Sequence, residues 1–120
     1  MHCNDKKDTA VTFTNVKRCP LAIVDLVDGL NVIIRKHKTI PDTVINFGGP
    51  NFLSRSEMAE NCKNYYLPEL SLKHSEAAAT FFQSRAKSIN INSNRLEEIL
   101  NRSLTSNELF FGRLKRKNIR

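Results

Sequence analysis

The chain has 120 residues, of which 40% are hydrophobic and 26% charged, and its formal net charge is +7. The length suits a single domain, and the composition excludes a collagen-like, coiled-coil or wholly disordered chain. The longest apolar-rich stretch, residues 21–34, is interrupted by polar residues and glycine, so it falls short of the ~18–20 apolar residues that a membrane span requires. Residues 1–8 are polar and charged, unlike a signal peptide, and we therefore expect a cytoplasmic protein.

The cysteines and histidines predict no metal site. They are widely spaced and form neither a CxxC pair nor a zinc-ligand pattern: Cys3, Cys19, Cys62, His2, His37 and His74. We expect three reduced thiols.

The first half of the chain predicts a strand, a helix and a second strand. Residues 11–13 alternate between apolar and polar, as in a short strand. Residues 43–47 are rich in strand-forming residues and run into Gly48-Gly49-Pro50, which predicts a buried strand ending in a tight loop. Between them lies a helical pattern with one apolar face: Ile23, Leu26, Val27, Leu30, Ile33 and Ile34.

The second half begins with a clear helix start. Ser54 and Glu57 form a capping box, Leu53 and Met58 occupy the hydrophobic-staple positions, and the helix should run to about Leu67. Residues 75–79 fit either one helical turn or a surface loop. Residues 88–92 alternate and predict a short strand with its isoleucines inward, before a helix capped by Asn92 or Ser93.

This order of elements predicts an α/β or α+β unit with three short strands and three main helices. We divide the chain into a polar N-terminal segment at 1–10, a folded region at 11–105 and a basic tail at 106–120. We expect the tail to be solvated and frayed.

Three segments resemble dTDP-4-dehydrorhamnose reductases, a family of extended short-chain dehydrogenases. Residues 18–27 resemble the family's R-x-P-V-x-V-x-D-V-A stretch, and residues 46–59 resemble its N-x-G-G-P-x-x-L-S-R-x-E-M-A stretch. Residues 85–96 resemble R-P-x-x-x-x-L-D-x-x-K-L, with Ala86 in place of proline and Asn92 in place of aspartate. The resemblance covers residues 11–105, is weak over 65–84, and extends to the regulatory beta subunit of methionine adenosyltransferase.

The resemblance implies the C-terminal portion of a Rossmann-type protein, with elements of its substrate-binding domain. It also implies NAD(P), yet the chain has neither the glycine-rich cofactor turn nor the catalytic Tyr-x-x-x-Lys, because Tyr65 is followed four places on by Glu69 and Tyr66 by Leu70. We therefore expect no catalytic residue and no cofactor bound by this chain alone.

Four residues are candidates for substrate binding. Arg85 matches the family arginine that holds the diphosphate of a nucleotide sugar, a task suited to a guanidinium. Gly48 and Gly49 form either a phosphate cradle or simply a tight turn. Arg55 lies in the first turn of a helix, where a cation is mildly unfavourable, and this hints at an external partner.

Three functions remain open. The first is a fragment or diverged member of the NAD(P)-dependent sugar-nucleotide reductases that lacks the cofactor-binding and catalytic half. The second is a non-catalytic regulatory or interaction protein resembling the beta subunit. The third, a small basic nucleic-acid binder, is supported only by the net charge and the basic tail, because the sequence has no helix-turn-helix, zinc-finger or ribonucleoprotein motif. We expect a nucleotide sugar or a protein as the partner, with self-association through the exposed edge of the strand at 43–47. We expect neither a membrane nor a nucleic acid as a partner.

Overall fold

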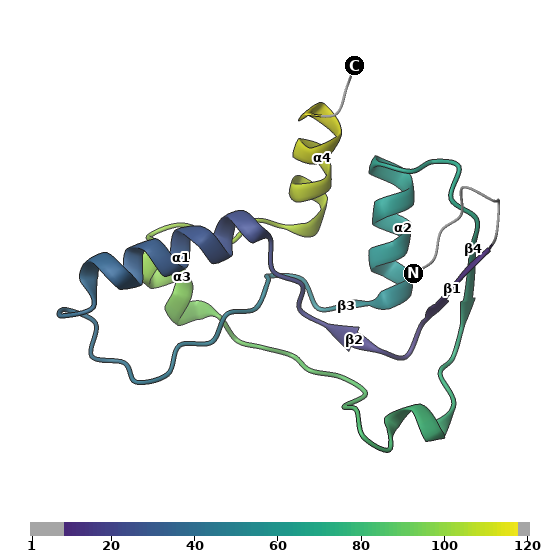
Figure 1. Cartoon of the computed structure of the whole chain (residues 1–120), viewed down its shortest axis with the longest axis horizontal. Helices are drawn as coiled ribbons and strands as arrows, with labels where there is room; N and C mark the ends of the chain where they lie inside the picture. The colour runs from purple at the N-terminus through teal and green to yellow at the C-terminus, as the bar shows by residue number, and fades with distance from the viewer. Residues whose placement is uncertain (1–8, 118–120) are drawn as a thin grey trace.

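The computed structural model describes residues 9–117, so the expected features at 1–8 and 118–120 lie outside the described residues (Figure 1). The fold is mixed α/β, as expected. Its elements in chain order are β1 (Ala10–Phe13), β2 (Lys17–Arg18), α1 (Ile23–Lys36), β3 (Leu53–Ser54), α2 (Arg55–Tyr65), β4 (Leu72–Ser75), the 3-10 helix η1 (Ala79–Phe82), α3 (Asn94–Leu100) and α4 (Asn107–Lys117). Along this described part, no helix is both long and apolar enough to cross a bilayer.

The strands of the described residues form two small sheets. β1 pairs in parallel with β4, with Ala10 opposite Leu72. β2 pairs antiparallel with β3, with Lys17 opposite Ser54, and Lys17 also forms a parallel bridge to Ser88 on its other side. Between residues 9 and 117 the strands therefore do not assemble into one larger parallel sheet of the Rossmann type.

Two of the three predicted strands are wrong. Residues 43–47 have a bend at Thr43 and form no strand, and Val44 is 76% exposed. Residues 88–92 contribute only the bridge at Ser88, and Ile89 is exposed rather than inward. A strand exists only where a second strand accepts and donates its backbone hydrogen bonds, and the described part of the chain supplies no partner for either segment.

The capping box predicted at the start of α2 is confirmed. The Glu57 amide donates to Ser54 Oγ at 3.0 Å, and the Ser54 amide donates to Glu57 Oε1 at 2.9 Å. The helix ends at Tyr65, two residues before the expected end.

The helix predicted at the first apolar pattern is also confirmed, but its apolar face does not point inward. α1 packs against α3 with the opposite face, where Asp25 and Gly29 are buried. A Cβ atom on Gly29 would lie 2.7 Å from the Phe47 ring and 3.1 Å from Leu96, so glycine is what allows this close packing. The apolar face is left exposed at five of its six positions, namely Ile23, Leu26, Val27, Leu30 and Ile34.

The expectation of a frayed basic tail at 106–120 is wrong for residues 107–117, which form α4 beside α2 (Figure 1). The helix has a local cause, because the Leu109 amide donates to Ser106 Oγ at 3.1 Å, as at a serine N-cap. Phe110 and Phe111 are half-buried on it.

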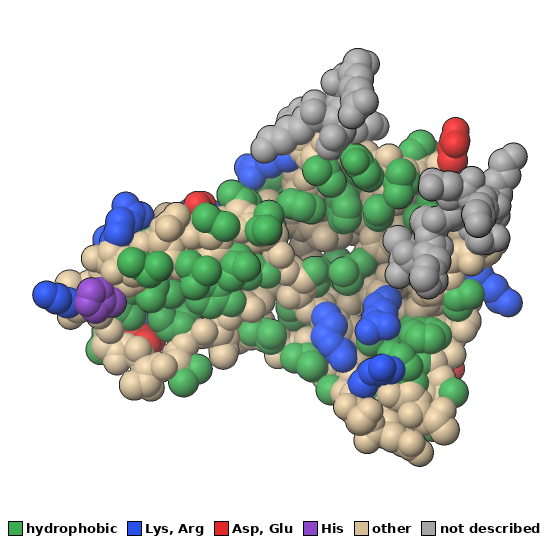
Figure 2. Space-filling view, in the orientation of Figure 1, with side chains coloured by type: hydrophobic (Ala, Val, Ile, Leu, Met, Phe, Trp, Pro, Cys, Tyr) green, Lys and Arg blue, Asp and Glu red, His purple; other side chains and the backbone are tan. Residues whose placement is uncertain are grey.

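The molecule is flat and has a small core. Its radius of gyration is 16.9 Å, with extents of 51 × 44 × 18 Å, whereas a compact chain of this length would have a radius near ~13.6 Å. Among the described residues, half of the buried apolar residues are alanine, and only Val16 and Leu96 have fully enclosed apolar side chains. Figure 2 shows hydrophobic side chains gathered on the surface over α1. Much of the apolar surface is therefore not covered by this chain.

Candidate functional site

β2 brings several basic residues together. Lys17 lies between β3 and residues 87–89, because its amide donates to the Lys87 carbonyl at 3.1 Å and its carbonyl accepts from the Ile89 amide at 3.1 Å. The Arg55 amide donates to the carbonyl of Val16, next to Lys17. Segments far apart in the sequence thus place their cations around one two-residue strand.

Two of the four candidate residues meet at one aromatic ring. The guanidinium carbon of Arg85 lies 4.5 Å from the centroid of the Phe81 ring, and that of Arg55 lies 5.5 Å from it. Cation–π contacts of this kind hold a guanidinium in place while leaving its charge available. Both side chains are exposed, so they are available to a ligand.

Two further cations lie over neighbouring rings, and the sequence analysis missed them. The Lys17 ammonium is 5.4 Å from the Phe52 ring, and the Lys87 ammonium is 5.9 Å from the Phe82 ring. The signal for part of this cluster was present in the sequence, because two adjacent phenylalanines are followed closely by an arginine and a lysine.

The other two candidates, Gly48 and Gly49, lie elsewhere. The Gly48 amide donates to Ser93 Oγ at 2.8 Å, and the Gly49 amide donates to the Cys19 carbonyl at 3.1 Å. A Cβ on Gly49 would sit 1.6 Å from the Pro20 carbonyl oxygen, which leaves room only for glycine. Both amides are bonded within the chain, and this favours a tight packing turn over a phosphate cradle.

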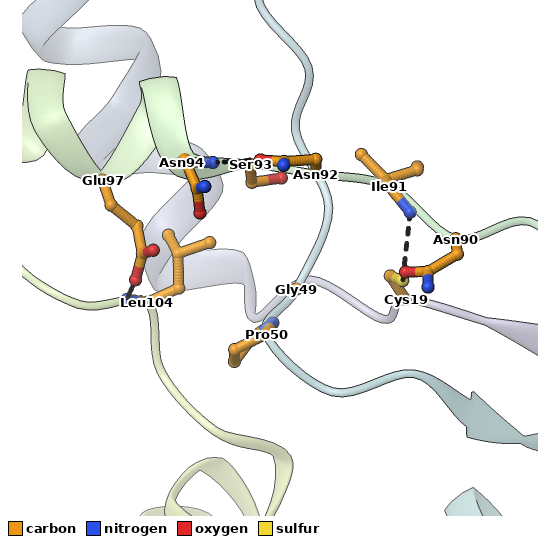
Figure 3. A pocket seen from close by; sticks show the side chains of 10 residues that line it. All are labelled: Cys19, Gly49, Pro50, Asn90, Ile91, Asn92, Ser93, Asn94, Glu97 and Leu104. Carbon is orange, nitrogen blue, oxygen red and sulfur yellow. Dashed lines mark hydrogen bonds between the residues drawn. The ribbon is translucent and has the colours of Figure 1, made fainter.

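Gly49 lines an open polar cavity of about 440 Å³ (Figure 3). Residues 90–94 supply half of its lining residues. Glu97 accepts from the Leu104 amide at 3.0 Å, and Cys19 Sγ accepts from the Ile91 amide at 3.4 Å. Its lining contains one carboxylate and no lysine or arginine. The cavity is therefore a poor match for a diphosphate.

Asp25 has a structural role at the centre of the fold. Its carboxylate is fully buried and accepts from the Thr105 amide at 2.7 Å, from Thr105 Oγ1 at 3.0 Å and from Arg102 Nη1 at 2.8 Å. Arg102 also reaches Asp28 at 2.8 Å, and hydrogen bonds to Asp25 first and Asp28 second raise the pKa of its guanidinium. The two aspartates thus tie α1 to the segment between α3 and α4.

A second polar chain links α2 to the β1–β4 sheet. His74 Nε2 lies 2.8 Å from Glu60 Oε1, and His74 Nδ1 lies 2.8 Å from Thr12 Oγ1, which in turn lies 3.1 Å from Ser56 Oγ. The order resembles that of a catalytic triad, but both hydroxyls are buried and bonded to each other. A substrate has no access to them, so this chain of hydrogen bonds is structural.

Two observations on the described residues bear on metal and cofactor binding. Across residues 9–117, no three histidine, cysteine or acidic side chains come together as a metal site. The cofactor turn of a Rossmann domain needs free backbone amides, and both amides of Gly48-Gly49 already have acceptors.

A scan against protein-family models and searches of curated proteins and of solved structures found no match to this chain.

Proposed function

We propose that this chain is a diverged, non-catalytic relative of the C-terminal part of the dTDP-4-dehydrorhamnose reductases and that it functions when docked on a Rossmann-type nucleotide-binding body. The observation that carries the proposal is the uncovered apolar face of α1. In proteins of this architecture, helices cover the faces of a parallel sheet. A chain that lacks the sheet would keep the helix but leave its apolar face exposed.

The size of the face supports the proposal. Ile23 is 66% exposed and Ile34 is 69% exposed, and three of the four residues between them on this face, Leu26, Val27 and Leu30, are also exposed. Burying one such side chain contributes ~1.5–3 kcal/mol, and a small domain is stable by only ~5–15 kcal/mol in total. Covering several of them on a partner would therefore change the stability of the chain substantially.

The arginine pair at Phe81 supports a role in holding substrate. Two guanidiniums on one ring match the bidentate chemistry that a nucleotide-sugar diphosphate requires. The partner would supply NAD(P), the hydride chemistry and the proton donor. This chain would supply cationic contacts and no reacting atom.

The test of the proposal is whether the chain binds the separately expressed nucleotide-binding half of a dTDP-4-dehydrorhamnose reductase. Sedimentation and calorimetry measure this binding. Leu30→Lys places a charge in the exposed apolar face and should abolish binding. Asn31→Lys, at the next exposed position of the same helix, should bind as the unmodified chain does. Equal binding by both variants, or no binding by the unmodified chain, would overturn the proposal.

The same purified chain should oxidise no NADPH with a dTDP-4-keto sugar. Activity from protein shown to be free of host reductase would contradict a non-catalytic role.

A second candidate is a regulatory or interaction protein like the beta subunit of methionine adenosyltransferase. The exposed face of α1 favours it as well, because an interface with any other protein also needs uncovered apolar surface. Association of the chain with itself, lost in Leu30→Lys and unaccompanied by binding to the reductase half, would favour this candidate over the first.

A further inference from the structure

The four cations held over phenylalanine rings form a surface that the proposed function does not fully use. We call it the basic platform, and it consists of Lys17, Arg55, Arg85 and Lys87 over Phe52, Phe81 and Phe82. Figure 2 shows lysine and arginine side chains gathered around hydrophobic ones in the region of β2.

The charge of the basic platform is not neutralised by the chain. The ion pairs among the described residues involve other cations, and none joins a carboxylate to these four side chains within 4.0 Å. Glu57, in the same helical turn as Arg55, is engaged with the Ser54 amide. Concentrated positive charge without counter-charges raises the local concentration of anions and accelerates their binding.

The rings fix where this charge lies. Both guanidinium carbons are measured to the same Phe81 centroid, so the two distances, 4.5 and 5.5 Å, keep Arg55 and Arg85 close to each other. The Phe81 and Phe82 centroids are 5.3 Å apart, which brings Lys87 into the same group. Side chains that are already held lose less conformational freedom when they bind.

The shape of the platform favours an extended polyanion. Three cavities in the described part of the chain are lined by other residues, and the four cations come from three separate segments: β2, the start of α2 and the loop after η1. A small anion would contact one or two of them, whereas a chain of phosphates can contact all four. A guanidinium with one face on a ring also leaves its second face for a nucleic-acid base, as arginines do in single-stranded RNA recognition.

We infer that the basic platform binds the phosphodiester backbone of single-stranded nucleic acid. Its cations come from β2, from the first residue of α2 and from the loop after η1, and each lies over a phenyl ring; cations beside aromatic rings suit the phosphates and bases of a flexible single strand. This inference goes beyond the proposed function, with which it shares Arg55 and Arg85, by adding Lys17 and Lys87 and a different ligand. It does not depend on α1, so Leu30→Lys should leave RNA binding unchanged.

The test is fluorescence anisotropy with a labelled 12-residue oligouridylate between 50 and 200 mM salt. Four phosphate contacts on a single strand predict a slope of about −3 in log K against log salt, hence a loss of roughly 50-fold in affinity over this range. A 12-residue oligoglutamate serves as competitor, and it should not displace the RNA at a hundredfold molar excess over it.

The test variant carries both Arg55→Gln and Arg85→Gln. The control variant carries Lys36→Gln and Lys38→Gln, which remove the same charge at the end of α1. The first pair should lower affinity at least tenfold and reduce the slope by about 1.4, while the control should change the slope little. If circular dichroism shows that the double arginine variant does not fold, Lys87→Gln replaces it, with an expected change in the salt slope of about 0.7.

An equal loss of RNA affinity in the double arginine variant and in the control variant would show that binding follows net charge alone, and would overturn the inference. Displacement by oligoglutamate would overturn it in favour of an acidic protein partner. The absence of binding at 50 mM salt would also overturn it.

Discussion

Replacing Asp25 by asparagine should destabilise the chain far more than the same replacement at Asp28. The Asp25 carboxylate is fully buried and accepts from two Thr105 donors and from Arg102. An asparagine in its place has one acceptor oxygen, and its amide group would face a donor. At least one buried Thr105 group would then lose its partner.

The magnitude follows from burial. Breaking a buried ion pair by removing one partner costs ~3–5 kcal/mol, and because the Arg102 side chain is 37% exposed and therefore partly screened by water, we take the low end, ~3 kcal/mol. Asp28 is 47% exposed, so its loss should cost ~0–1 kcal/mol. Against a total stability of ~5–15 kcal/mol, only the first change is large.

Urea unfolding at pH 7, followed by far-ultraviolet circular dichroism, measures the difference. The midpoint of the Asp25→Asn chain should fall well below that of Asp28→Asn, with the dependence on urea concentration unchanged. Equal midpoints for the two variants would refute the view that Asp25 is the buried link between α1 and the segment after α3.

Three further outcomes are expected. Ser54→Ala should lower the free energy of unfolding by ~1 kcal/mol in the same urea assay, because the α2 capping box is lost; no change would contradict a role for the cap. Gly49→Ala should prevent native folding or shift the backbone, because the new Cβ would overlap the Pro20 carbonyl, and an unchanged amide spectrum by NMR would contradict this packing. Hydrogen bonding to Arg95 lowers the pKa of Asp42, so the pair should stabilise the chain at pH values above 3.8, the ordinary pKa of this carboxyl, and lose that effect as the pH falls through the lowered pKa. The urea midpoint, measured from neutral pH to below pH 3.8, should therefore depend less on pH in Arg95→Gln. An equal dependence on pH in both proteins would contradict a contribution from this pair.

The sequence predicted what local chemistry decides. The cap at Ser54 needs only a serine and a glutamate three residues apart, and the apolar spacing that predicts α1 repeats within the helix itself. Ser106, which caps the start of α4, is a local signal of the same kind.

The sequence did not predict what distant partners decide. Residues 43–47 have strand-forming side chains, yet no strand forms because the described residues offer nothing to pair with. The buried face of α1 contains an aspartate and a glycine, and only the positions of Thr105 and Phe47 explain why. The meeting of Arg55 and Arg85 at Phe81 depends in the same way on how β2 arranges its neighbours.

The parallel pairing of β1 with β4 has a consequence for synthesis on the ribosome. Ala10 pairs with Leu72, and Asp25 can bind Thr105 only after the ribosome has added 80 more residues. Contacts between residues so distant in sequence form slowly, because the intervening chain must close a long loop first. During that interval α1 is already complete, with its aspartate unpartnered and its apolar face exposed, so nascent chains of this protein should be a ready target for chaperones that recognise exposed hydrophobic segments.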